Sequence, residues 1–166
     1  MKIGLLSDTH NYLDPLVFKY FDEMDEIWHA GDIGSMDLLN QLEKFKPTKS
    51  VYGNIDGHEI RAASPENLIF CCEGVNVLMT HIAGKPPHYN ARVKGLIKEH
   101  LPGILICGHS HILKVEFDKI NQLLFINPGA AGKHGFHQIK TLVRFEIRDQ
   151  KPQNLEVIEL GKRSSK

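Results

Sequence analysis

The sequence predicts an α/β fold in which two packed, mixed β-sheets are flanked by helices. Three observations lead to this prediction. The first half alternates short apolar runs with helix-like segments, the second half is rich in strand-like segments, and the length of 166 residues fits one domain. We expect a single domain over residues 1–160 and a frayed tail over residues 161–166.

The first half has the order strand, helix, strand, helix, strand. Its first strand is a nearly continuous apolar run, typical of a strand that is buried on both faces. Pro15 can open the first helix and Ser35 can cap the second, and each helix carries an apolar stripe. This order predicts parallel strands joined by right-handed crossovers. The expected elements are strand 2–7, helix 15–21, strand 26–29, a helix that follows Ser35, and strand 48–52.

The second half begins with a predicted hairpin. Glu73-Gly74 separates two apolar runs, which is a turn signal between antiparallel strands. Asn90 can cap a helix that Pro102-Gly103 ends. The last two segments alternate apolar and polar residues, which favours a sheet with one exposed face. The expected elements are strands 67–72 and 75–80, helix 90–100, and strands 104–107, 113–117, 122–126, 141–147 and 155–160.

Composition narrows the classes of function. The 20 lysines and arginines balance 20 aspartates and glutamates, so no overall field attracts nucleic acid or an anionic membrane. The sequence also lacks a basic stripe with interleaved aromatics, which disfavours long nucleic acid as a partner. No stretch approaches the roughly 18 apolar residues of a membrane span. The three cysteines show no paired spacing. We therefore expect a cytoplasmic protein without a membrane segment.

Five short motifs carry aspartate, asparagine and histidine side chains, and each follows a predicted strand. The carboxyl ends of parallel strands meet at one edge of a sheet, so these side chains are expected to converge there. Carboxylate, amide and imidazole groups in such a cluster suit a site for two divalent metal ions. The motifs are Asp8-Thr9-His10, Gly31-Asp32, Gly53-Asn54-Ile55-Asp56, His81 and Gly108-His109-Ser110-His111.

Each motif taken singly has an ordinary structural explanation. Gly31-Asp32 and the segment around Asn54 could be turns, and His81 alone could be a hydrogen-bonded core histidine. The paired histidines of Gly108-His109-Ser110-His111 are harder to explain by packing. If strand geometry continues beyond the first strand, Asp8 and His10 point to the same side. Because all five motifs share a place at strand ends, we prefer the interpretation as one metal site.

These motifs, in this order, resemble the calcineurin-like metallophosphoesterase superfamily, and the short chain resembles its small single-domain phosphodiesterase branch. The resemblance runs from residue 3 to about residue 130 and includes Asn127-Pro128-Gly129. It implies two metal sites that share Asp32, and it implies catalytic roles for Asp32, Asn54 and His109. One ion would be held by Asp8, His10, Asp32 and His111, and the other by Asp32, Asn54, His81 and His109.

One position departs from the family pattern. The superfamily has a histidine after the asparagine, where it assists the leaving group or binds the phosphate, and this chain has Ile55. The small phosphodiesterase branch is similar in lacking that histidine. Asp56, which would orient the missing histidine, is still present, and we expect it to support the turn or a neighbouring ligand.

The sequence therefore predicts a metal-dependent phosphodiesterase, in which a hydroxide shared by two ions attacks a small phosphodiester. Manganese is the first expectation for the metal, with iron, nickel or zinc as alternatives. Lys85 and His134 are candidate substrate contacts, and His134 could replace the missing acid. Three alternatives stay open: a phosphomonoesterase, a nucleotide pyrophosphatase, and a non-catalytic protein-binding scaffold like the retromer subunit of this fold. A homo-oligomer is also left open.

Overall fold

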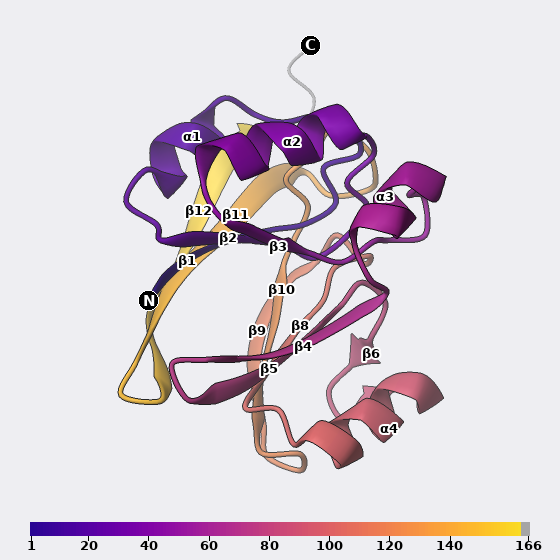
Figure 1. Cartoon of the computed structure of the whole chain (residues 1–166), viewed down its shortest axis with the longest axis vertical. Helices are drawn as coiled ribbons and strands as arrows, with labels where there is room; N and C mark the ends of the chain where they lie inside the picture. Colours follow the sequence, from indigo (N-terminus) through magenta and orange to yellow (C-terminus); the bar gives the residue numbers. More distant parts are fainter. Residues whose placement is uncertain (164–166) are drawn as a thin grey trace.

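Two five-stranded mixed sheets pack face to face in the computed structural model, with helices on both outer sides (Figure 1). The structure describes residues 1–163. The strand order is β12-β11-β1-β2-β3 in one sheet, called sheet 1, and β4-β5-β8-β10-β9 in the other, called sheet 2. The predicted α/β fold of two packed mixed sheets is confirmed.

Sheet 1 contains the predicted βαβαβ unit. Strands β1, β2 and β3 run parallel, as expected from the helical crossovers between them, and β11 pairs antiparallel with β1 and with β12. The crossover helices α1 and α2 cover the outer face of this sheet (Figure 1). The elements are β1 (Lys2–Leu6), α1 (Leu16–Phe21), β2 (Glu26–His29), α2 (Met36–Phe45), β3 (Thr48–Ser50), β11 (Ile139–Arg148) and β12 (Lys151–Lys162).

Sheet 2 holds the predicted hairpin at one edge and a parallel centre. Strands β4 and β5 are antiparallel, β5, β8 and β10 are parallel, and β9 returns antiparallel to β10. Helix α4 begins after Asn90, whose side chain accepts the amide of Val93, and covers the outer face. The elements are β4 (Asn67–Cys72), β5 (Val75–Thr80), α4 (Ala91–His100), β8 (Ile104–Ile106), β9 (Leu113–Asp118) and β10 (Leu123–Pro128).

One helix and one small hairpin are not predicted from the sequence. Helix α3 (His58–Ala63) has six residues and a single buried side chain, Ile60, so it is too short to show helical periodicity. Strands β6 (Gly84–Lys85) and β7 (His88–Tyr89) form a small hairpin of two residues each. Neither has the length at which an apolar pattern becomes visible.

The last strand is longer than predicted. The strand expected over residues 155–160 extends over Lys151–Lys162, because Gly161 and Lys162 still pair with β11. The rest of the expected tail, residues 164–166, lies outside the described residues. Within the described part of the chain, no helix combines the length and the apolarity that crossing a bilayer requires.

The main core lies between the sheets. Trp28 of β2 is fully buried there and meets the rings of Phe70 and Phe145 edge to face, at centroid distances of 5.0 and 5.7 Å. A second apolar cluster lies between sheet 1 and its helices, where Phe21 packs directly on Gly4 of β1. This glycine lets the helix approach the strand, since any side chain would occupy the place of the ring.

Substituting Gly4 by alanine tests this close approach. The added Cβ would lie 2.7 Å from the Phe21 ring, so Gly4→Ala is expected to lower the free energy of unfolding by about 1–3 kcal/mol. Gly95→Ala, on the exposed side of α4 where an added Cβ meets nothing, is expected to raise it by up to about 1 kcal/mol. Urea denaturation measures both, and equal effects of the two substitutions would contradict the packing described.

Candidate metal centre

The carboxyl ends of parallel strands from both sheets meet at one rim of the sandwich. Strands β1, β2 and β3 lead into three of the sequence motifs, and β5 and β8 of the other sheet lead into the remaining two. The convergence predicted for a single sheet edge thus uses two sheets. The structure brings together all seven residues expected to be metal ligands: Asp8, His10, Asp32, Asn54, His81, His109 and His111.

One group of donor atoms comes from Asp8, His10 and His111, within 4.8 Å of one another. The two Nε2 atoms of the histidines are 3.3 Å apart, and Nε2 of His111 is 3.2 Å from Oδ1 of Asp8. Ligands bound at about 2.0–2.1 Å around one tetrahedral ion lie roughly 3.4 Å apart. The spacing of these three side chains therefore matches that of ligands around a single cation.

A second group adjoins the first and comes from Asp32, His81 and His109. Nε2 of His81 lies 3.2 Å from Oδ1 of Asp32. Asn54 reaches the same place, because its Oδ1 is 2.9 Å from Nδ1 of His109. The set combines carboxylate, amide oxygen and imidazole, and among the described residues no cysteine joins either group.

Asp32 stands between the two groups. Its Oδ1 faces His81, and its Oδ2 lies 3.6 Å from Nε2 of His10 in the first group. The backbone amide of Ile55 donates to Oδ1 over 3.1 Å, which fixes the carboxylate. Gly53 makes room for it, since a Cβ there would collide with the carboxylate. One side chain thus offers an oxygen to each group, as a bridging ligand must.

His81 provides the clearest sign that the site fits a cation. Its Nδ1 donates to the carbonyl oxygen of Ala30 over 2.7 Å. Nε2 is buried, faces the carboxylates of Asp32 and Asp8, and has no hydrogen-bond partner within residues 1–163. A neutral histidine held in this way by its other nitrogen is the usual state of a metal ligand. The residues present therefore fit a dinuclear metal site.

The pKa values of His81 and Asp32 are shifted in the directions that favour positive charge at the site. Burial lowers the pKa of His81, but the neighbouring carboxylates of Asp32 and Asp8 outweigh burial, so the pKa is raised. Burial likewise raises the pKa of Asp32, and the interaction with His81 outweighs it and lowers the pKa. A proton and a metal ion thus compete for the same nitrogen, and metal binding is expected to weaken as the pH falls.

The backbone at five of the seven donor residues is left-handed rather than extended. Strand β1 ends at Leu6, so the condition under which strand alternation would align Asp8 and His10 is not met, although both side chains reach the same donor group. Both have positive φ, 55° and 46°, and turns instead of a pleat direct their side chains. Asp32, His109 and His111 share this conformation, with φ of 54°, 67° and 57°. Aspartate and histidine tolerate it better than most residues.

Asp56 joins two of the ligand loops. Its Oδ2 accepts the backbone amides of Gly53 and Ile33 over 2.7 and 3.1 Å, and its Oδ1 accepts that of Gly34 over 2.8 Å. The side chain is almost completely buried. Asp56 thus ties the loop that carries Asp32 to the loop that carries Asn54, consistent with the supporting role expected for it.

Two further side chains, Asn127 and His29, support the loops that carry the metal ligands. Only Asn127 lies in a motif that the sequence analysis identifies. Asn127, at the end of β10, donates to the carbonyl of Gly108 over 2.8 Å and to Oγ of Ser110 over 3.0 Å. It lies in the Asn-Pro-Gly segment that resembles a family loop. His29 is buried next to Thr9, and burial lowers its pKa to about 4. His29 gives no signal in the sequence beyond its place on a strand.

The two predicted substrate contacts lie in different places. The ring of His134 is exposed and centred 5.0 Å from the ring of His10, at the edge of the first group. Lys85 is exposed on the β6–β7 hairpin and is not among the residues that line the pocket next to the site. Ile55 occupies the position of the missing histidine and is 47% exposed.

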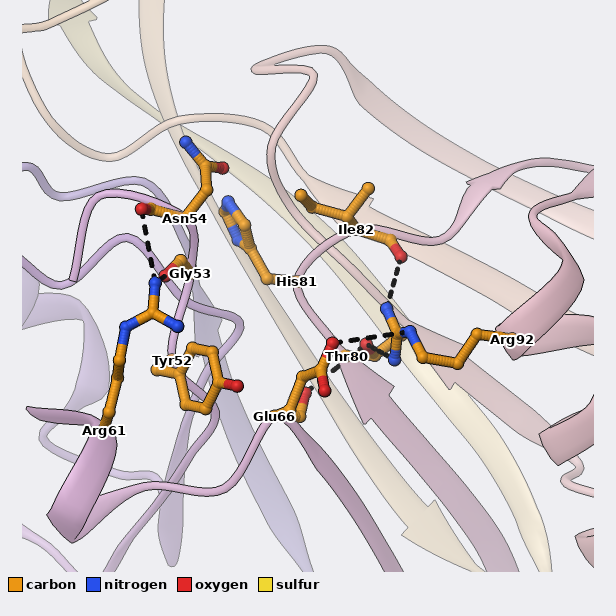
Figure 2. Close-up of a pocket in the computed structure, with 9 residues that line it drawn as sticks. All are labelled: Tyr52, Gly53, Asn54, Arg61, Glu66, Thr80, His81, Ile82 and Arg92. Atoms are coloured by element: carbon orange, nitrogen blue, oxygen red, sulfur yellow. Dashed lines mark hydrogen bonds and ion pairs between the residues drawn. The ribbon is translucent and has the colours of Figure 1, made fainter.

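A small pocket opens beside the second group, with a volume of about 190 Å³. Asn54 and His81 form one end of it, Glu66 lies toward the other, and the guanidinium of Arg61 stacks 4.3 Å from the centre of the Tyr52 ring (Figure 2). Pockets for drug-sized ligands are larger, at about 300–1,000 Å³. The remaining lining residues are Gly53, Thr80, Ile82 and Arg92.

Comparisons with known proteins agree with this geometry. The family profile of the calcineurin-like phosphoesterase superfamily domain matches residues 1–150, so the chain belongs to this superfamily. It is similar to a phosphodiesterase of Methanocaldococcus jannaschii, with 28% identity over 145 residues that span 78% of this chain and 83% of the relative.

Two solved structures share the fold. One is that of an archaeal phosphodiesterase, with a TM-score of 0.76 and 24% identity over 96% of this chain and 100% of the other. The second is Vps29 of Chaetomium thermophilum, with a TM-score of 0.74 and 14% identity over 96% of this chain and 97% of the other. At these identities the likeness establishes the fold alone, and the chemistry depends on the side chains of the site.

Removing the Asp56 carboxylate tests its role between the loops. Asp56→Ala leaves three backbone amides without their acceptor, and we expect the free energy of unfolding to fall by about 3 kcal/mol. Binding of Mn²⁺, measured by calorimetry, is expected to weaken by about 10–100-fold, because the ligand loops lose their connection. Asp56→Asn, which keeps one carbonyl oxygen, should lie between wild type and Asp56→Ala.

Asp22→Ala removes an exposed carboxylate and is the matched control, for which we expect wild-type affinity. If Asp56→Ala bound Mn²⁺ as tightly as the wild type, the assignment of Asp56 as a support of the site would be wrong.

Proposed function

We propose that the protein is a metal-dependent phosphodiesterase that hydrolyses small phosphodiesters. The observation that carries the proposal is the pair of adjoining donor groups that share Asp32, together with the partnerless Nε2 of His81. Asp8, His10, Asp32 and His111 would hold one ion, and Asp32, Asn54, His81 and His109 would hold the other. When bound, two divalent ions supply Lewis-acid activation of water and of the phosphoryl oxygens.

The protein's own side chains would orient the substrate. Asn54 lies where the second donor group meets the pocket, with its Oδ1 turned toward His109, so its amide nitrogen can donate a hydrogen bond to a phosphoryl oxygen. The pocket beyond Asn54 can receive one ester substituent, and its size favours a small one. Arg61 lies in the same pocket, where its positive charge favours a negatively charged phosphoester.

The preference for diesters follows from the missing acid. Ile55 has no proton to give to a leaving oxygen, and general acid catalysis typically contributes about 10²–10⁴-fold. A diester with a good leaving group depends least on that proton. His134, exposed beside His10, is our candidate for partial replacement of the acid. The set of oxygen and nitrogen donors without thiolate leads us to propose manganese first, then iron, nickel or zinc.

A substrate panel tests the proposal. With Mn²⁺ present, we expect bis(4-nitrophenyl) phosphate to be hydrolysed faster than 4-nitrophenyl phosphate, and a chelator to abolish both activities. His81→Ala is expected to lower diester hydrolysis by roughly 100-fold or more, since it removes a ligand rather than a supporting contact. His88→Ala, an exposed histidine on β7, is the control and should keep full activity.

Full activity in chelator, or unchanged activity of His81→Ala, would overturn the metal-dependent mechanism. A much faster hydrolysis of monoesters would instead favour the phosphomonoesterase alternative, and hydrolysis of dinucleotide pyrophosphates alone would favour a pyrophosphatase.

A further inference from the structure

Strand β9 forms an open edge of sheet 2. It pairs with β10 on one side, and within residues 1–163 no backbone hydrogen bond reaches its outer edge, while the hydroxyl of Tyr89 on β7 donates to the side chain of Asp118 at its end. An exposed edge presents unpaired amides and carbonyls, and proteins normally protect such edges or use them to bind another strand. The outer edge of β9 is therefore available to pair with another strand.

The side chains of β9 leave an apolar row exposed. Leu113, Val115 and Phe117 point to one face of the sheet and are 37%, 39% and 53% exposed. Their neighbours on β10 in the same row, Leu124 and Ile126, pack into the core between the sheets. The apolar face of sheet 2 thus continues past the core onto β9, where about half of the row's surface stays exposed within residues 1–163.

The sequence of β9 is complementary to itself. In an antiparallel pair of two copies, with the twofold axis at Val115, Leu113 lies opposite Phe117 of the second copy. Lys114 then lies opposite Glu116 of the second copy on the other face, so the ion pairs that these two residues form within each chain, at 2.6 Å, meet across the axis with alternating charge. Moving the axis by one residue in either direction would place like charges opposite each other. One register therefore satisfies both the apolar row and the charges.

We propose that the partner of this edge is a second copy of the chain, joined through β9 to form one continuous sheet across a twofold axis. The two β9 strands would extend sheet 2 of each copy. This inference does not depend on the proposed catalytic function, because it uses none of the metal-site residues. A pair of six-residue strands buries less than the roughly 1,200–2,000 Å² of a standard stable interface, so we expect a dissociation constant of about 10–100 µM.

Charge reversal distinguishes this register from other modes of association. Lys114→Glu puts two acidic pairs across the axis, and Glu116→Lys puts two basic pairs there. Each single variant is expected to weaken dimerisation by about tenfold or more in sedimentation velocity experiments between 2 and 200 µM. The double variant Lys114→Glu/Glu116→Lys restores opposite charges and is expected to dimerise like the wild type.

A mixture of the two single variants provides the sharpest test. In the proposed register, an acidic pair on one chain meets a basic pair on the other, so the mixture should form heterodimers at concentrations where each variant alone is mostly monomeric. Val115→Lys, at the axis, should be monomeric, and Lys94→Glu on the exposed side of α4 should dimerise normally. Circular dichroism would confirm that each variant is folded.

A wild-type protein that stays monomeric up to 200 µM would overturn the proposal. So would a dimer that is unaffected by Val115→Lys and by both single charge reversals, because its interface would lie elsewhere.

Discussion

Two buried carboxylates facing one rim of the sandwich are the constraint on which the rest of the site depends. Asp8 is fully buried and Asp32 is 2% exposed, and both lie among imidazoles. Buried charge without compensation is strongly destabilising, so an arrangement of this kind requires positive charge close by. His81 can provide it as a proton carrier, and a metal ion can provide it more strongly.

The supporting structure is arranged around this requirement. Five of the seven donor residues adopt left-handed backbone, which costs of the order of 1–3 kcal/mol for each residue in a sparsely populated conformation. Such a conformation persists only where the surroundings determine it. Here Asp56 fixes the Asn54 loop through the amide of Gly53, and Asn127 fixes the His109 loop through the carbonyl of Gly108. Gly53 leaves the space into which the shared carboxylate fits. The strained backbone thus lowers the stability of the fold, but it directs the donor atoms toward the two cation positions.

Much of the fold could be predicted from the sequence because its longer elements have clear periods. The parallel βαβαβ unit, the β4–β5 hairpin and helix α4 were all visible as apolar runs, stripes and caps. Helix α3 and the β6–β7 hairpin were not, because their few residues cannot show a period. The donor residues could be named from their place at strand ends. Their left-handed backbone and the supports at Asp56 and Asn127 depend on tertiary contacts, for which a single sequence gives little signal.

The central claim is that Asp32 links two cation sites, and anomalous diffraction from crystals grown with Mn²⁺ tests it most directly. We expect two anomalous peaks roughly 3.5–4 Å apart, with Asp32 bound to both ions. We also expect the peak next to His81 to disappear in crystals of His81→Ala. A single peak away from Asp32, or no peak in crystals soaked at saturating Mn²⁺, would contradict the claim.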